Sequence, residues 1–344
     1  MSDASTGRGR RPRGASGRPR IEDVAAAAGT TAITVSRTLR QPDKVAPETR
    51  RRVMEAIEAL GYIPNLSASA LASRRSGIMA LVVPTIANSV FAETVDGFSE
   101  VAGRAGLQIL LGQGTYSPEA EHALLTALAG RQPDALARIG IVRRPETRAL
   151  LKRTRIPIAE TWDLTDDPID LVVGFSNRAA GRAMTRHLLA RGRRRIAYIG
   201  SDDDRAAARR HGYAEALAET GLEPAAPDIR VQEITYGAGR RALRALLQLA
   251  PEADAAFCAN DVLAVGALLE CRKVGVVVPD QLAIAGLGDL EIAQELTPAL
   301  TTVRVPSRAI GARAAELLLA RIAGEPVERR VVDLGFEIVE RESV

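Results

Sequence analysis

The sequence predicts an α/β protein: an N-terminal three-helix helix-turn-helix headpiece and a hinge helix, followed by a core of two open parallel-sheet subdomains. Three observations support this fold class. Short helical patterns broken by Gly29, Pro42 and Pro47 occupy residues 20–64. From residue 76 onward, apolar strands alternate with helical segments of about 10 to 15 residues, as repeated βα units do. The length of 344 residues allows two or three domains with sizeable cores.

The composition is that of an ordinary globular protein. Hydrophobic residues make up 46% of the chain and charged residues 26%, which excludes wholesale disorder, a collagen-like chain and a disulfide scaffold. No apolar run reaches the roughly 18 residues of a membrane span, and the polar start MSDASTGRGRRPRGASGRPR lacks a signal-peptide core. We therefore expect a cytoplasmic protein with no membrane partner, in which Cys258 and Cys271 are buried small hydrophobes.

Positive charge is concentrated at the N-terminal end. Residues 1–75 carry 14 Lys and Arg against 7 Asp and Glu, a net charge of +7, whereas the remaining residues carry 32 against 35, a net charge of −3. This separation predicts an N-terminal part that binds a polyanion. Residues 1–19 mix Arg, Gly, Ser and Pro without apolar periodicity, which is typical of a disordered basic arm.

Three helices are expected within residues 20–64, over 22–28, 31–39 and 48–60, with Thr31 as the N-cap of the second. The side chains expected to form their core are Val24, Ala27, Val35, Leu39, Val53, Ile57 and Leu60. The side chains expected to face outward at the second helix are Thr31, Ala32, Ile33, Thr34, Ser36 and Arg37. Short side chains there let a helix enter a DNA major groove. A small helical bundle that binds no nucleic acid would show the same spacing.

The amino-acid sequence of this segment favours DNA binding. The strings DVAAAAGTTAITVSRTLR and VAPETRRRVMEAIEALGYIPN closely resemble the headpiece of the lactose-repressor (LacI/GalR) family of bacterial transcription regulators, over about forty residues without a gap. The next segment, NLSASALASRR at 65–75, shares the family's hinge pattern through Asn65, Ala68 and Leu71. The resemblance implies that two hinge helices of a dimer pack together and that Leu71 inserts into the minor groove. A plain interdomain linker is the alternative.

The strands expected in the core span 78–84, 108–112, 137–142, 156–160, 171–175, 195–200, 229–234, 255–259, 282–286 and 331–336. Residues 76–344 thus suggest two similar open sheets, with the chain crossing between them near 162–178 and 290–306. The cleft between two such halves is the expected ligand site. RGRRRIAYIG, HGYAEAL, FCANDVLAVGALLECRKVGVVVPDQLAIAGLGD and LTPALTTVRVP resemble the periplasmic-binding-protein-like core of the same family. The resemblance weakens at DALARIGIVRR, where the family usually shows D-G-L-I-L.

No catalytic residue, cofactor or metal site is predicted. The sequence contains no G-x-x-x-x-G-K-[ST] loop and no G-x-G-x-x-G after a strand. Gly174-Phe175-Ser176 lacks the closing glycine of a nucleophile elbow, and three scattered histidines form no ligand pattern.

Polar residues at strand ends are the expected effector-binding residues. Placed on the family pattern, these positions are Asp163, Arg205, Arg209, Tyr236, Asn260, Gly288 and Asp289, with Phe91 as a pocket wall. Structural roles are the alternatives: Asp261 as the N-cap of the following helix, Arg209 as a link between helices, and Tyr236 as a packing residue.

Gly288 stands where many family members carry an aspartate that receives sugar hydroxyls. Losing this acid while keeping two arginines favours an anionic ligand, because a guanidinium pairs bidentately with carboxylate or phosphate. VVPTIANSVFAETVDG, AVGALLECRKVG and VDLGFEI look most like the gluconate-utilisation repressors of the family. We therefore expect a sugar-acid effector such as gluconate or a ketogluconate.

The function expected from these features is repression of transcription, by a homodimer on a palindromic double-stranded DNA operator. Effector binding would rearrange the core halves and thereby change the hinge segments. Two other classes are weighed against this one. A solute-binding sugar receptor would have a signal peptide and no basic headpiece, and an α/β sugar-processing enzyme would need a catalytic constellation.

Overall fold

The structure is a computed structural model that describes residues 19–63, 75–87, 89–114 and 117–344. The chain forms two compact units, Met1–Arg74 and Arg75–Val344. The expected hinge residues Asn65, Ala68 and Leu71, and almost all of the expected basic arm, lie outside the described residues. None of the helices in the described ranges combines the length and the hydropathy that a membrane span requires.

The N-terminal unit contains α1 (Ile21–Ala27), α2 (Ala32–Arg40), the 3-10 turn η1 (Pro42–Lys44) and α3 (Pro47–Leu60). Its buried core consists of Val24, Ala25, Ala28, Val35, Val53 and Ala56. Ala27, which the spacing placed in this core, is exposed, because Ala25 and Ala28 share the inward face with Val24. Leu60, also placed there, is exposed at the last position of α3. Gly29 takes φ +59° in the turn between α1 and α2, a conformation that favours glycine.

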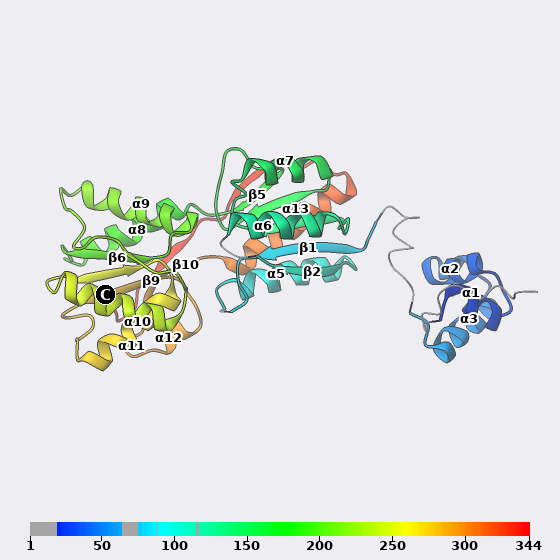
Figure 1. The fold of residues 1–344 in the computed structure, drawn as a ribbon, viewed down its shortest axis with the longest axis horizontal. Helices are drawn as coiled ribbons and strands as arrows, with labels where there is room; N and C mark the ends of the chain where they lie inside the picture. The colour runs from blue at the N-terminus through cyan, green and yellow to red at the C-terminus, as the bar shows by residue number, and fades with distance from the viewer. Residues whose placement is uncertain (1–18, 64–74, 88, 115–116) are drawn as a thin grey trace, which may run out of the picture. The chain divides into compact units, whose positions relative to one another are not determined.

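The first sheet of the core unit has the strand order β11-β5-β4-β3-β1-β2, all parallel. Its strands are β1 (Ile78–Val83), β2 (Gln108–Gln113), β3 (Ala135–Ile139), β4 (Ile158–Thr161), β5 (Leu171–Gly174) and β11 (Val331–Asp333). The 3-10 turn η2 (Ser89–Phe91) precedes α5 (Ala92–Arg104). α5 and α13 (Ser307–Ala323) pack on one face, and α6 (Pro118–Ala129) and α7 (Pro145–Thr154) pack on the other (Figure 1).

The second sheet has the order β12-β10-β9-β8-β6-β7, in which only β12 runs antiparallel to its neighbour. Its strands are β6 (Ile196–Gly200), β7 (Ile229–Arg230), β8 (Ala255–Cys258), β9 (Ala283–Gly288), β10 (Thr301–Arg304) and β12 (Glu337–Val339). Its helices are α8 (Asn177–Ala190), α9 (Asp204–Ala218), α10 (Tyr236–Leu249), α11 (Asp261–Val274) and α12 (Ile292–Glu295). The core is therefore α/β with two open sheets that are almost entirely parallel.

The chain passes between the two sheets three times. It leaves the first sheet after β5, returns to it after β10, and crosses again between β11 and β12. The expectation of one strand over 331–336 is wrong, because Gly335 takes φ +67° and its N–H donates to Asp333 Oδ1 at 2.9 Å. This turn ends β11 and sends the chain to the other sheet.

Helices α8 and α9 pack so closely that the backbone of each helix contacts the backbone of the other. A Cβ atom on Gly181 would lie 2.0 Å from the Arg209 carbonyl oxygen, and one on Gly212 would lie 1.9 Å from the Arg178 carbonyl oxygen. No side chain other than hydrogen fits at either position. This contact fixes α9, whose first turns carry Arg205 and Arg209.

Candidate functional site

Helix α2 presents the outward face that the sequence indicates. Ile33 is 71% exposed, Thr31 and Arg37 are exposed, and Ala32, Thr34 and Ser36 are half-buried. Ala32, Ile33, Ser36 and Arg37 line a shallow groove together with Arg40 and Gln41. An exposed apolar side chain of this size beside polar ones is suited to contact with base edges and thymine methyl groups.

Hydrogen bonds order the start of α2. The Thr34 N–H donates to the Thr31 Oγ1 at 3.2 Å, so Thr31 is the N-cap as predicted. The Thr31 and Thr34 hydroxyls lie 3.0 Å apart, and the Arg40 Nε donates to Ser36 Oγ at 3.1 Å. The Arg37 guanidinium, by contrast, makes no hydrogen bond or ion pair with the described residues, which leaves all of its donors available.

A cavity of about 490 Å³ lies between the two subdomains of the core. Its walls come from the carboxyl ends of β1 and β3, from α6, and from the start of α9, where ligands of open α/β sheets bind. The charged side chains that line it are Glu121, Arg138, Arg143, Arg144, Asp163, Asp202, Asp203, Asp204 and Arg205. This volume and this mixture of polar and apolar walls are typical of small-molecule sites.

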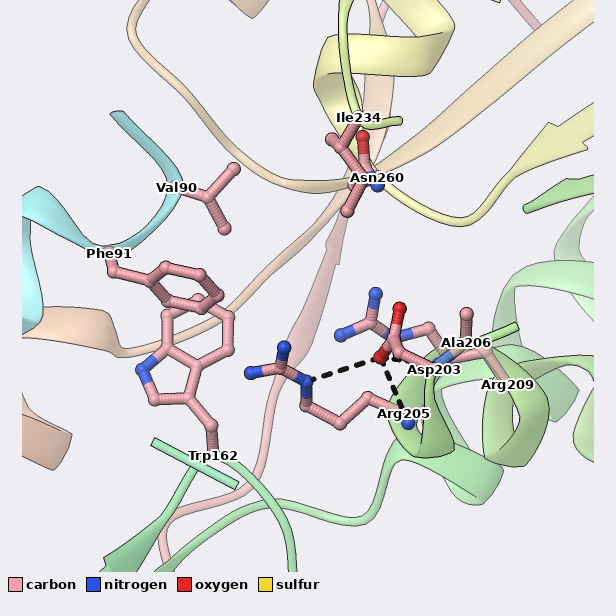
Figure 2. A pocket seen from close by; sticks show the side chains of 9 residues that line it. All are labelled: Val90, Phe91, Trp162, Asp203, Arg205, Ala206, Arg209, Ile234 and Asn260. Atoms are coloured by element: carbon pink, nitrogen blue, oxygen red, sulfur yellow. Dashed lines mark hydrogen bonds and ion pairs between the residues drawn. The ribbon is translucent and has the colours of Figure 1, made fainter. Parts of the chain in front are cut away.

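A second, smaller hollow of about 20 Å³ shares Asp203 and Arg205 with the larger cavity, and Figure 2 shows its lining. Phe91 meets Trp162 edge-on, with ring centroids 4.9 Å apart. The Arg205 guanidinium carbon lies 5.1 Å from the Phe91 ring centroid, a cation–π contact. Phe91 is thus a wall of this hollow, and Arg205 connects the hollow to the larger cavity.

Arg209 and Asn260 line the small hollow, but much of their bonding capacity is used by the protein. The Arg209 Nε donates to Asn177 Oδ1 at 2.8 Å, and its Nη1 donates to the Ala259 carbonyl at 2.6 Å. Burial lowers the pKa of Arg209. The Asn260 Oδ1 accepts the Leu263 N–H at 3.0 Å and caps α11. Arg209 therefore does link its helix to neighbouring segments.

The expected N-cap role of Asp261 is wrong, because Asn260 holds that position. Asp261 is fully buried; its Oδ1 accepts the Thr302 hydroxyl at 2.6 Å and its Oδ2 accepts the Leu290 N–H at 2.9 Å. Burial raises the pKa of Asp261 to about 6. Asp163 lines the larger cavity and accepts from Asn177 Nδ2 at 3.1 Å.

Three expected effector-binding residues line neither of these two cavities. Tyr236 is 46% exposed at the first position of α10. Gly288 takes φ +139° at the end of β9, close to the Asp261 carboxylate. Asp289 is held by Arg304 Nε and Arg341 Nη2, each at 2.6 Å. The Asp289 carboxylate is thereby neutralised inside its own subdomain, away from the cavity.

The sequence reasoning missed Arg138, Glu121, Trp162 and Asp203. Arg138, on β3, forms an ion pair with Glu121 of α6, and both side chains are less than one-fifth exposed. The Asp203 Oδ1 accepts the Arg205 N–H at 3.2 Å and the Ala206 N–H at 3.4 Å at the start of α9. A signal for Arg138 was present, since the segment DALARIG places an arginine inside an apolar strand.

Two family models match the chain: residues 20–65 match "Bacterial regulatory proteins, lacI family", and residues 185–344 match "Periplasmic binding protein-like domain". The HTH-type transcriptional regulator GntR of Pseudomonas aeruginosa is 40% identical over 329 residues, which cover 95% of this chain and 96% of that protein. GntR of Escherichia coli (strain K12) is 37% identical over 322 residues, which cover 93% of this chain and 97% of that protein. The crystal structure of transcription regulator GntR from Chromobacterium violaceum is 39% identical and has a TM-score of 0.75, covering 77% of this chain and 98% of that chain.

Proposed function

Because this chain belongs to the LacI family of bacterial regulatory proteins and is a transcriptional regulator, we propose that a sugar acid such as gluconate, bound between its core subdomains, controls its affinity for operator DNA. Its relatives are named as transcriptional regulators, which does not favour the enzyme or the solute-receptor alternative. The regulator is proposed to act as a repressor. Its effector is inferred from the chemistry of the residues that line the cavity.

The observation that carries this proposal is that the Arg205 side chain is buried and incompletely hydrogen-bonded. Its side chain is only 9% exposed and lines the cavity, and its nearest carboxylate oxygen, Asp203 Oδ1, lies 3.5 Å from Nε. Its Nη1 atom is buried without a hydrogen-bond partner among the residues that the structure describes. An unpaired buried guanidinium donor is costly, and a ligand carboxylate would supply the missing acceptor.

The segment at the end of β9 supports the same ligand class. Gly288 replaces the side-chain carboxylate that a neutral sugar would use, and Asp289 is already bound to Arg304 and Arg341. Neither residue offers a free acid for sugar hydroxyls. Together with the unpaired Nη1 of Arg205, the lack of a free acid at these two positions favours a ligand that brings its own negative charge.

DNA recognition is assigned to α2 of a homodimer bound to a palindromic operator. Ile33 and Arg37 would contact base edges, whereas neighbouring basic groups and helix ends would contact phosphates and set the register. One short helix reads too few base pairs for useful specificity, so two headpieces must bind together. The hinge segment at 65–75 would transmit the effector signal from the core.

Isothermal titration calorimetry of the full chain tests the ligand class. The panel contains gluconate, a ketogluconate, glucose and a purine nucleoside. We expect saturable heat with the aldonates alone. Binding of glucose or of the purine, together with no uptake of either aldonate, would overturn the sugar-acid assignment and leave the family membership unchanged.

A further inference from the structure

We infer that Arg138 is a specificity-determining residue that binds the anionic group of the effector jointly with Arg205, one guanidinium from each subdomain. This inference rests on the proposed function, because it concerns the same cavity. A ligand of this site must carry a compact oxyanion, either a carboxylate or a phosphate, on a polyhydroxylated chain.

The placement of Arg138 in the sheet is unusual for an arginine. It lies on β3, which is paired on both sides by parallel strands, with Val82 and Glu160 in register with it. Its neighbours Ala137 and Ile139 are buried in the core. An arginine is rarely retained in such surroundings unless its charge is used, because the desolvation of a guanidinium is expensive.

The loop after β3 makes room for this guanidinium. Gly140 takes φ +101°, and a Cβ atom placed on it would lie 3.1 Å from Arg138 Nη1. Gly140 and Arg138 both line the cavity. A side chain at 140 would crowd Arg138 Nη1, so glycine there lets the guanidinium lie beside the cavity wall.

Nearby acids do not satisfy Arg138 completely. Glu121 lies against its Nε, whereas Nη1 is buried without a hydrogen-bond partner among the described residues. Glu160, its neighbour in register, accepts the Val142 N–H at 2.8 Å and the Ile169 N–H at 2.9 Å, so both of its oxygens are already engaged. The Nη1 group of Arg138 is thus left without an acceptor.

Arg138 and Arg205 carry like charges and line the same cavity. Burial lowers the pKa of Arg138, and the positive charge of Arg205 lowers it further, against the opposing effect of Glu121. Each of the two guanidiniums has an unsatisfied Nη1, and each lines the same cavity of about 490 Å³. An oxyanion bound between them would accept from both and remove the repulsion.

The decisive measurement compares two ligands that differ only in charge, gluconate and its neutral amide gluconamide, by calorimetry on the full chain. Wild type should prefer gluconate. Arg138→Gln should lose about 10- to 100-fold in gluconate affinity, the range of a charge-assisted hydrogen bond, and should bind gluconamide nearly as wild type does. Arg313→Gln is the matched control, since Arg313 is a half-exposed arginine of α13 paired with Glu316 at 3.0 Å. It should retain the wild-type preference.

A second variant keeps the test valid if Arg138→Gln does not fold. Arg138→Lys retains the charge but loses the planar fork, so its preference for gluconate should be intermediate. Thermal melting of each variant shows whether it is folded. A folded Arg138→Gln or Arg138→Lys that keeps the full wild-type preference would overturn the role of Arg138 while leaving gluconate as the effector.

Other ligands separate the two proposals. If wild type binds glucose 6-phosphate but not gluconate, and Arg138→Gln loses that binding, the paired-arginine site stands and the sugar-acid effector fails. If wild type binds no anionic ligand of this set, both the site and the effector assignment are wrong. If it binds gluconate and gluconamide equally, the paired-arginine site is wrong.

Discussion

Arg37 is the arginine of α2 whose guanidinium makes neither a hydrogen bond nor an ion pair with the described residues, and it is expected to contact a base. Replacing Arg37 with Ala should lower the affinity for operator DNA by about 10- to 100-fold, as the loss of a bidentate base contact does. Binding to DNA of scrambled sequence should change much less. Fluorescence anisotropy with both DNA fragments measures the ratio.

Arg51→Ala is the control for this prediction. Arg51 belongs to the same unit, but its guanidinium pairs with Glu48 and Glu55 at 2.6 and 2.7 Å on the exposed side of α3. Its removal should leave the ratio between operator and scrambled DNA unchanged. Equal losses on the two DNA fragments for Arg37→Ala would mean that Arg37 contacts only phosphates.

Asp261 predicts a pH dependence of stability. Its pKa in the fold is about 6, raised by burial from an ordinary value of 3.8. The folded state therefore holds this proton more tightly, so its contribution to stability is present below about pH 4 and is lost as pH rises through 6. Asp261→Asn should gain stability relative to wild type by an amount on the order of 1–3 kcal/mol between pH 4 and pH 7.

Urea unfolding of both proteins across this pH range measures the effect. Asp280→Asn, at an exposed position, is the control and should show no such gain. If Asp261→Asn and wild type changed in parallel with pH, the Asp261 carboxyl would not be the group that titrates.

Three expected effector-binding residues line one of the two cavities, because each lies in the segment that follows a strand. Asp163 follows β4, Arg205 lies at the start of α9 after β6, and Phe91 follows β1. Asp289 also follows a strand, but its partners Arg304 and Arg341 come from β10 and the C-terminal segment. Ion pairs between residues this far apart in the sequence cannot be predicted from the local sequence pattern.

At the scale of elements, the contact between α8 and α9 positions the arginines of the site. Gly212→Ala should push the helices apart, because the new Cβ would lie 1.9 Å from the Arg178 carbonyl oxygen. We expect a loss of about 1–3 kcal/mol in the free energy of unfolding, together with weaker gluconate binding. Chemical denaturation and calorimetry measure the two effects.

Gly103→Ala in α5 provides the contrast. No atom lies within 4 Å of the Cβ that this substitution would add, so the helix should be unchanged or stabilised by about 0.5–1 kcal/mol. Equal effects of the two substitutions would show that the spacing of α8 and α9 does not depend on Gly212.

The sequence predicts where the strands and helices lie along the chain better than it predicts which of them pair or pack together. Apolar runs such as IMALVV and IAYIG locate β1 and β6 because both faces of these strands are buried. The short β10 and β12 were not expected: TTVR and EIV carry polar residues and pair at the edge of the second sheet. The return of α13 to the first sheet depends on packing against α5, which lies far away in the sequence.

At the scale of the whole molecule, charge and core are both divided near residue 75. The helices of the N-terminal unit enclose their own buried cluster, separate from those of the core unit. A fragment of residues 76–344 should therefore bind gluconate as the full chain does but should not bind DNA. Calorimetry and anisotropy on this fragment test both statements, and loss of gluconate binding would show that the headpiece contributes to the effector site.

The full chain should bind DNA with a strong dependence on salt, because residues 1–75 carry a net charge of +7 and the rest of the chain carries −3. The anisotropy of a labelled fragment from upstream of the gene's own operon, titrated with protein with and without gluconate, measures the coupling between the two units. We predict specific binding that gluconate weakens. Specific binding that is unchanged by saturating gluconate would contradict control by this sugar acid.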